Sequence, residues 1–213
     1  MAYTVKEIFY SLQGEGVQTG VPAIFCRFSG CNLWSGKEED RVRSVCGFCD
    51  TNFLGTDGPL GGIFEDAEGL AESITEVLPE RPSATVKPLV VLTGGEPALQ
   101  ADSTLIEAIH RFGYQIAIET NGTLPLPAGI DWVTVSPKAN TKLVVQSGDE
   151  LKIVYPQEDI FLESFENLNF KHFVLQPKDG TDLKKNIKSC LMHCFAHPRW
   201  RLSVQSHKII GIR

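Results

Sequence analysis

The sequence has little of what secreted, membrane-spanning or nucleic-acid-binding proteins need. Its six cysteines in 213 residues are too few for a disulfide-dense scaffold. The first residues lack the basic and apolar segments of a signal peptide, and no apolar run approaches the roughly 20 residues of a membrane-spanning helix. Lys and Arg number 20 against 26 Asp and Glu, so we expect no broad basic face. These shortages predict a cytoplasmic protein that binds neither nucleic acid nor membrane.

What is present is the composition of an ordinary globular protein. Hydrophobic residues make up 42% of the chain and charged residues 22%, which is enough apolar surface for a sizeable core. No internal repeat and no long linker divides the sequence. We therefore expect a single domain spanning residues 1–213.

The order of apolar patterns predicts the fold class. Short runs rich in β-branched residues predict strands covered on both faces. They occupy residues 23–28, 89–92, 116–118, 133–135, 151–154, 173–175 and 202–204. Helical spacing of apolar residues predicts helices within 67–78, 105–112 and 183–194, with Gly113 and Pro198 ending the second and third. This alternation predicts an α/β fold with a mostly parallel sheet, open or curled into a partial, abbreviated TIM-like (β/α) barrel. Residues 34–43 and 55–62 have loop composition.

Polar motifs begin where five of the apolar runs end. They are Thr93-Gly94-Gly95-Glu96-Pro97, Glu119-Thr120-Asn121-Gly122, Ser136-Pro137-Lys138, Gln176-Pro177-Lys178 and Gln205-Ser206-His207-Lys208. The carboxyl ends of parallel strands lie at one edge of a sheet, so these motifs are predicted to converge on one site. Each motif alone could be a turn, since Gly, Pro, Asn and Ser are turn residues. Turns do not require Glu, Lys, Gln and His, so a shared site explains the five together better.

Three cysteines form a separate cluster with the spacing C-x14-C-x2-C. They are Cys31, Cys46 and Cys49. Structural zinc sites use four protein ligands, whereas three thiolates on an iron–sulfur cluster leave one iron open for an outside ligand. The alternatives are a zinc site completed by a distant His or Cys, and three unrelated cysteines. Phe48 is placed to shield a bound cluster.

These motifs resemble those of the radical S-adenosylmethionine (SAM) superfamily. The resemblance rests on Cys46-Gly47-Phe48-Cys49 and on Gly94-Gly95-Glu96-Pro97 after a strand. The gap of fourteen residues departs from the usual C-x3-C-x2-C and points to one subgroup, the 7-carboxy-7-deazaguanine synthase family. The sequence resembles that family from end to end. The matching segments are 11–16, 25–28, 30–33, 46–51, 93–97, 119–122, 136–138, 176–177, 200–203 and 205–208.

The resemblance implies an activity and its cofactors. It implies a lyase with a 4Fe-4S cluster, SAM and Mg2+ that converts 6-carboxy-5,6,7,8-tetrahydropterin to 7-carboxy-7-deazaguanine. The ring contracts by radical rearrangement with loss of ammonia, and the product feeds synthesis of queuosine in tRNA and of other deazapurines. A flavodoxin or ferredoxin as the reducing partner and a homodimer are also implied, as is an extended loop that carries the cluster.

The resemblance also suggests roles for individual residues. It assigns the 4Fe-4S cluster to Cys31, Cys46 and Cys49, and magnesium to Thr51. SAM contacts are expected from Phe48, Asp50, Gly94, Gly95, Glu96, Asn121, Ser136, Pro137, Lys138 and Gln176. Substrate contacts are expected from Leu12, Gln13, Gly14, Glu15, Gly16, Arg27, Thr93, His207 and Arg213. Glycines permit close approach, carboxylates suit an ammonium group, and a guanidinium suits the substrate's carboxylate.

Plainer interpretations of several of these residues stay open. Arg27 within an apolar run needs a partner, which is either an anionic ligand or an ion pair with the protein. Asp50 and Thr51 are equally typical of a helix or turn cap, and Glu119 and Asn121 of strand ends and turns.

The helix predicted at 183–194 carries two pairs spaced by four residues. Cys190 and Cys194 continue its apolar stripe, which favours core packing, whereas His193 and His197 lie about 100° away. All four together could instead hold zinc. Cys26 is expected to be a buried strand residue.

Two other functions compete with the lyase. A radical SAM activase would act on a glycine in a protein, but the motif at Gln13 to Gly16 and the extended cysteine loop favour the pterin. A zinc-binding module would use Cys31, Cys46 and Cys49 structurally and perform no chemistry. Iron content and colour after anaerobic purification distinguish these possibilities.

Overall fold

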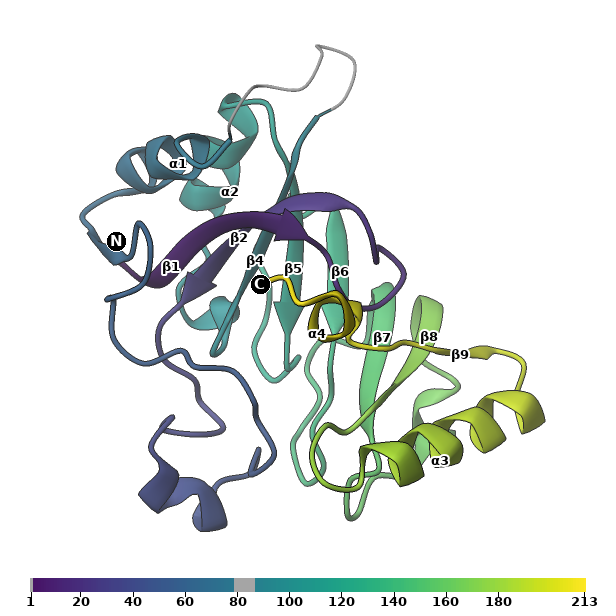
Figure 1. Cartoon of the computed structure of the whole chain (residues 1–213). Coiled ribbons are helices and arrows are strands. Elements are labelled where there is room, and N and C mark those ends of the chain that lie inside the picture. The colour runs from purple at the N-terminus through teal and green to yellow at the C-terminus, as the bar shows by residue number, and fades with distance from the viewer. Residues whose placement is uncertain (1, 79–86) are drawn as a thin grey trace.

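The computed structural model describes residues 2–78 and 87–213. Within this part, nine strands form a single sheet (Figure 1). The strands are β1 (Tyr3–Leu12), β2 (Pro22–Phe28), β3 (Gly62–Phe64), β4 (Leu89–Gly94), β5 (Gln115–Thr120), β6 (Trp132–Val135), β7 (Ser147–Tyr155), β8 (Asn169–Pro177) and β9 (Trp200–Leu202). The α-helices are α1 (Ala67–Thr75), α2 (Ser103–Arg111), α3 (Leu183–Ala196) and α4 (Ser206–Ile210), and short 3-10 helices are η1 (Glu38–Arg43), η2 (Pro97–Leu99) and η3 (Leu162–Phe165). No helix in the described residues has the length and apolar character needed to cross a membrane.

The sheet is mostly parallel and open. Its strand order is β3-β1-β2-β4-β5-β6-β7-β8-β9, and every pairing from β2 to β9 is parallel. Only β1 runs antiparallel to its neighbours, β2 and β3. Because β3 and β9 are the two edges, the barrel does not close. The predicted α/β class with a mostly parallel sheet and a partial barrel is confirmed.

Alternation along the strands separates a core face from a polar face. In β2, Ile24, Cys26 and Phe28 belong to the core that α1 and α2 cover. Their neighbours Phe25 and Arg27 point to the opposite face. Figure 1 shows α1 and α2 together beside the first half of the sheet and α3 beside β8 and β9. The face away from α1 and α2 is therefore available for polar side chains.

The helices begin and end as their sequences indicate. Asp66 caps α1 by accepting from the N–H of Gly69 at 2.9 Å, and Asp102 caps α2 in the same way through Leu105. Gly113 adopts φ of 86° directly after α2, a conformation that suits glycine. A second hydrophobic core includes residues of β6, β7, β8 and β9. On α3, Cys190 is fully buried in this second core with Cys194 packed against it, which confirms core packing for these cysteines.

The prediction omitted β3, η2, η3 and α4, and three further elements differ from it. The apolar pattern did not reveal β1, because Lys6 and Glu7 interrupt it, although both are buried and ion-paired. The last strand, β9, precedes the predicted segment 202–204 by two residues, so its register places Trp200 beside Phe173. The loop at 34–43 contains η1, which has no buried residues.

Candidate active site

The polar ends of the strands line one cavity of about 670 Å3. Each of the five motifs contributes at least two lining residues, so their predicted convergence is confirmed. The cysteine loop between β2 and β3 and the segment after β1 complete the wall. Of the residues expected to bind cofactor or substrate, those lining it are Leu12, Gln13, Gly14, Glu15, Arg27, Cys31, Cys46, Phe48, Cys49, Asp50, Thr51, Thr93, Gly94, Gly95, Asn121, Ser136, Lys138, Gln176, His207 and Arg213.

Three of the expected binding residues do not line the cavity. Pro137 is buried between Ser136 and Lys138, which do line it. Gly16 instead packs against Glu150, since a Cβ there would lie 2.1 Å from Oε1 of that carboxylate. Its backbone φ of 68° also suits glycine. Gly16 and Pro137 are adjacent to residues that line the cavity, and their direct contacts stay predictions.

Glu96 is the third expected residue that does not line the cavity. Its fully buried carboxylate accepts from the N–H of Ala98 at 2.9 Å, the hydroxyl of Thr120 at 2.6 Å and the N–H of Asn121 at 2.7 Å. Burial raises the pKa of Glu96, and these hydrogen bonds oppose that change. Glu96 thus joins the end of β4 to that of β5 and orients Thr120 and Asn121, which line the cavity. Its contact with an ammonium group stays a prediction.

Replacing Glu96 by Gln tests this bracing role. The amide would present N–H donors to groups that already donate, leaving a buried polar group unsatisfied. We expect Glu96→Gln to lower the free energy of unfolding by about 1–3 kcal/mol in chemical denaturation. Glu158→Gln, at an exposed carboxylate, serves as the matched control. Equal stabilities for the two variants would argue against the bracing role.

The three clustered cysteines line the cavity together. Cys46 donates a hydrogen bond to Cys49, which raises the pKa of Cys46 and lowers that of Cys49 to about 6. Burial raises the pKa of Cys31, and the charge of Cys49 raises it further. Among the described residues, three thiols without a fourth cysteine beside them at the cavity fit an iron–sulfur cluster with one iron open to an outside ligand.

Lys138 is a cavity-lining cation whose charge interacts with two of these thiols. Its ammonium group donates to the carbonyl oxygen of Ser136 at 2.6 Å and to its hydroxyl at 2.8 Å. Burial lowers the pKa of Lys138, whereas the charges of Cys46 and Cys49 raise it. A cation held here compensates part of the negative charge of thiolates.

A buried lysine organises one group of carboxylates at the cavity. Lys152 Nζ lies 2.7 Å from Glu15 Oε2 and 3.3 Å from Glu119 Oε1, and its side chain is 5% exposed. Burial alone would raise the pKa of Glu15, but Lys152 and hydrogen bonds from Gln205 and Gln176 lower it to about 2. Glu15 is therefore a charged acceptor at the cavity wall, and Glu119 lines the cavity beside it.

Gln13 links this group to the loop after β1. Its amide donates to Glu119 Oε1 at 2.9 Å, and its carbonyl oxygen accepts from the N–H of Glu15 at 3.1 Å. Gly14 lies against His207: a Cβ at Gly14 would come 2.1 Å from Nδ1 of that ring. Ser206 closes the contact by donating to the Gly14 carbonyl. The start of α4 is thereby attached to the loop after β1.

Two arginines meet at a shared carboxylate. Arg27 Nε donates to Glu7 Oε1 at 2.9 Å, and Arg213 pairs with the other oxygen of Glu7. Both guanidinium groups lie over the ring of Phe9, at 5.9 and 4.9 Å from its centroid. The ion-pair alternative for Arg27 is therefore correct, yet two guanidinium groups against one carboxylate leave a local excess of positive charge. That excess suits an anionic ligand.

Two further predicted residues have protein partners as well. Asp50 accepts from Lys208 Nζ at 2.6 Å, and Lys208 also pairs with Asp179 at 2.6 Å. The hydroxyl of Thr51 donates to the sulfur of Cys49. Both side chains still line the cavity.

The sequence patterns did not identify several of the residues that build the site. Lys152 was detectable, because a charged residue inside the apolar run 151–154 requires a buried partner, the reasoning already applied to Arg27. Glu7 was not detectable from the sequence, since it lies on β1, which the apolar pattern did not predict. Lys208 was in a predicted motif, but nothing in its spacing indicates the pairs with Asp50 and Asp179.

Comparison with known proteins identifies the family. No model of a protein family matches the sequence. The chain is 56% identical over 215 residues to the 7-carboxy-7-deazaguanine synthase of Nitratidesulfovibrio vulgaris and 54% identical over 212 residues to that of Bordetella pertussis, with 100% of each chain covered. The crystal structure of QueE from Escherichia coli is similar with a TM-score of 0.69 and 28% identity, covering 97% of this chain and 95% of that one. The chain belongs to the 7-carboxy-7-deazaguanine synthase family of radical SAM enzymes.

Proposed function

We propose that this chain, acting as one domain over residues 1–213, converts 6-carboxy-5,6,7,8-tetrahydropterin to 7-carboxy-7-deazaguanine and ammonia. One observation supports this most: a single cavity brings together three thiols, a group of charged acceptors and a pair of guanidinium groups. Its volume of about 670 Å3 is in the range of sites for small molecules and cofactors.

The cofactor side of the site comprises the cysteine loop and the ends of the central strands. Cys31, Cys46 and Cys49 would hold a 4Fe-4S cluster, and SAM would lie against Gly94 and Gly95, where the lack of side chains permits close backbone approach. Bound there, cluster and SAM together supply a carbon-centred radical by one-electron cleavage of a sulfonium bond. The aromatic rings that line this part keep water from it: Trp34, Phe48 and Phe53.

Additional SAM contacts come from side chains at the ends of β6 and β8. Phe48, Asp50 and Asn121 would flank the cofactor, and Ser136, Lys138 and Gln176 would contact its ribose and adenine. The hydroxyl and amide groups among them match the donors and acceptors of a nucleoside.

The substrate would be oriented by charge at two places. Glu15, with the neighbouring Gln13 amide, would accept from the amino-pyrimidinone edge of the pterin, which carries several N–H donors. Arg27, Arg213 and His207 would bind the substrate's carboxylate. Leu12, Gly14 and Thr93 would complete the wall.

The finer cofactor and partner assignments belong to the same proposal. Thr51 would contribute a ligand to Mg2+, which takes its remaining ligands from water and substrate. The resemblance supports a flavodoxin or ferredoxin as electron donor and a homodimer. The six cysteines are unpaired, which supports a reducing, cytoplasmic compartment.

Substituting Gly95 tests whether the turn after β4 positions the cluster ligands. A Cβ at Gly95 would lie 1.9 Å from the Gly30 carbonyl oxygen and 3.0 Å from Cys31 Cβ, so the backbone before Cys31 must move. We expect Gly95→Ala to lower the iron content per chain and to reduce turnover at least tenfold. Gly69→Ala, within α1, is the control. Its new Cβ meets nothing closer than 3.5 Å, so iron content and turnover should be unchanged. Full iron content in Gly95→Ala would contradict this positioning.

The proposed reaction is tested by incubating anaerobically reconstituted enzyme with SAM, a reductant and the carboxytetrahydropterin, followed by mass analysis. We expect a product lighter than the substrate by one ammonia and SAM recovered unchanged. Absence of this product from iron-loaded enzyme, or consumption of one SAM per product, would contradict the proposed reaction.

A further inference from the structure

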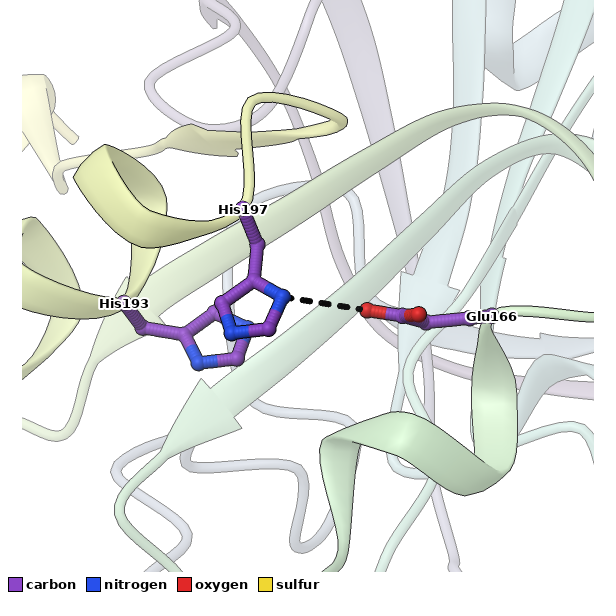
Figure 2. A group of neighbouring side chains, drawn as sticks. All are labelled: Glu166, His193 and His197. Atoms are coloured by element: carbon purple, nitrogen blue, oxygen red, sulfur yellow. Dashed lines mark ion pairs between the residues drawn. The ribbon is translucent and has the colours of Figure 1, made fainter.

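Two histidines and a glutamate lie together on the outer side of the second half of the sheet. Glu166 directly follows η3, His193 is in the last turn of α3 and His197 is the residue at which that helix ends. Figure 2 shows the two rings stacked, with the carboxylate directed at the edge of the His197 ring. One potential ligand atom from each residue lies within 4.8 Å of the other two.

The contacts within this group arrange its ligand atoms. The imidazole rings are 4.2 Å apart between centroids and 11° from parallel. His197 Nδ1 lies 3.6 Å from Glu166 Oε1, which also accepts from the indole N–H of Trp200 at 3.3 Å. Ligands on one tetrahedral zinc ion are separated by about 3.4 Å, given bonds of about 2.1 Å. The ligand atoms are therefore near enough to share one ion, provided that one ring rotates out of the stack so that both nitrogen lone pairs point to it.

Hydrogen bonds among the described residues leave one ring nitrogen of this group without a partner. The ion pair with Glu166 accounts for one nitrogen of His197. His193 Nε2 is buried and has no hydrogen-bond partner among the described residues. A buried ring nitrogen without a partner costs stability, whereas a metal ion accepts its lone pair.

We propose that Glu166, His193 and His197 bind a divalent transition metal ion of the zinc type, at a site separate from the catalytic cavity. None of the three residues lines that cavity. Two imidazoles spaced by four residues on a helix with one carboxylate are a zinc ligand set, and imidazole selects against Mg2+. The side chains of Glu166 and His197 are 35% and 41% exposed, so the ion has access from solvent and retains water at its remaining position.

The site would join two segments that also meet in the second hydrophobic core. The ion links the connection between β7 and β8, which contains η3, to the end of α3. Trp200 Nε1 holds the Glu166 carboxylate from β9, in the manner of residues that orient metal ligands. Cys190 and Cys194 are not members of the site, because they pack into the core.

Zinc binding by the reconstituted holoenzyme, washed with a chelator, tests the proposal. Isothermal titration with Zn2+ and elemental analysis after gel filtration are expected to give one zinc per chain beyond the iron content, with a higher melting temperature. His197→Gln and Glu166→Gln should each weaken zinc binding at least tenfold, and millimolar Mg2+ should not compete.

The control is another histidine paired with a carboxylate. His110 lies 2.9 Å from Asp131 on the surface and belongs to no group of three ligands among the described residues. His110→Gln should therefore keep full zinc affinity. No stoichiometric zinc in the native protein, or equal affinity in His197→Gln, Glu166→Gln and His110→Gln, would overturn the proposal. Since binding and melting are measured without turnover, this result does not depend on the proposed reaction.

Discussion

Cys46→Ala is expected to abolish product formation while leaving the chain folded. Cys46 lines the cavity with Cys31 and Cys49, and its sulfur donates to that of Cys49. With two thiols instead of three, the chain cannot hold the cluster, and the ring contraction has no other source of radicals in the site. Iron content should fall to background, and mass analysis should detect no 7-carboxy-7-deazaguanine.

Cys190→Ala is the matched control for the loss of one buried thiol. Cys190 is fully buried in the second core, and its sulfur contacts the carbonyl oxygen of Tyr155 at 3.8 Å. Its removal should cost about 1 kcal/mol of stability but leave iron content and turnover close to native. If Cys46→Ala retained iron and activity, or if both variants lost them equally, the assignment of Cys46 would be wrong.

Lys152→Met is expected to lower the free energy of unfolding by about 3–5 kcal/mol, because it leaves Glu15 and Glu119 without their buried cation. The same change should raise the KM for the pterin, since Glu15 loses the charge that holds it in place. Chemical denaturation and steady-state kinetics measure the two effects.

The control is Lys171→Met, which breaks a similar 2.7 Å pair with Asp149 but on a lysine that is 71% exposed. It should cost about 0–1 kcal/mol.

The effect of Lys152 should also depend on pH. The pKa of Glu15 is lowered from 4.5 to about 2 in the folded protein, so its stabilising effect is complete above pH 4.5 and is lost as the pH falls toward 2. Without Lys152, burial raises the pKa of Glu15 instead. In the variant, Glu15 therefore takes up a proton at a higher pH, which removes the cost of its buried, unpaired charge. The stability difference between native protein and variant should therefore shrink on acidification. A stability difference that does not change with pH would show that the pair of Lys152 and Glu15 is not its cause.

The sequence was most informative where a strand ends in polar residues. Continuous apolar runs identified the parallel strands, and parallel strands bring their carboxyl ends to one edge, which is why Gly94, Asn121, Lys138, Gln176 and His207 line the same cavity. The three-thiol spacing likewise indicated a site for a cluster. These inferences depend on topology and residue type alone.

Side-chain direction and pairing were beyond the sequence patterns. Glu96 follows a strand in a motif, yet its buried carboxylate accepts from three donors, which lie at the end of β5, directly after β5 and in η2. Glu7 was missed because the partners that permit its burial, Arg27 and Arg213, are 20 and 206 residues away. A local pattern does not contain such distant pairings.

Electron paramagnetic resonance of the reduced, iron-loaded protein, with and without SAM, tests the central claim most directly. If three thiols hold the cluster and one iron accepts the amino and carboxylate groups of SAM, the cluster spectrum must change when SAM is added, with about four irons per chain. A spectrum that SAM leaves unaltered, or a protein that carries zinc in place of iron at these cysteines, would contradict the account.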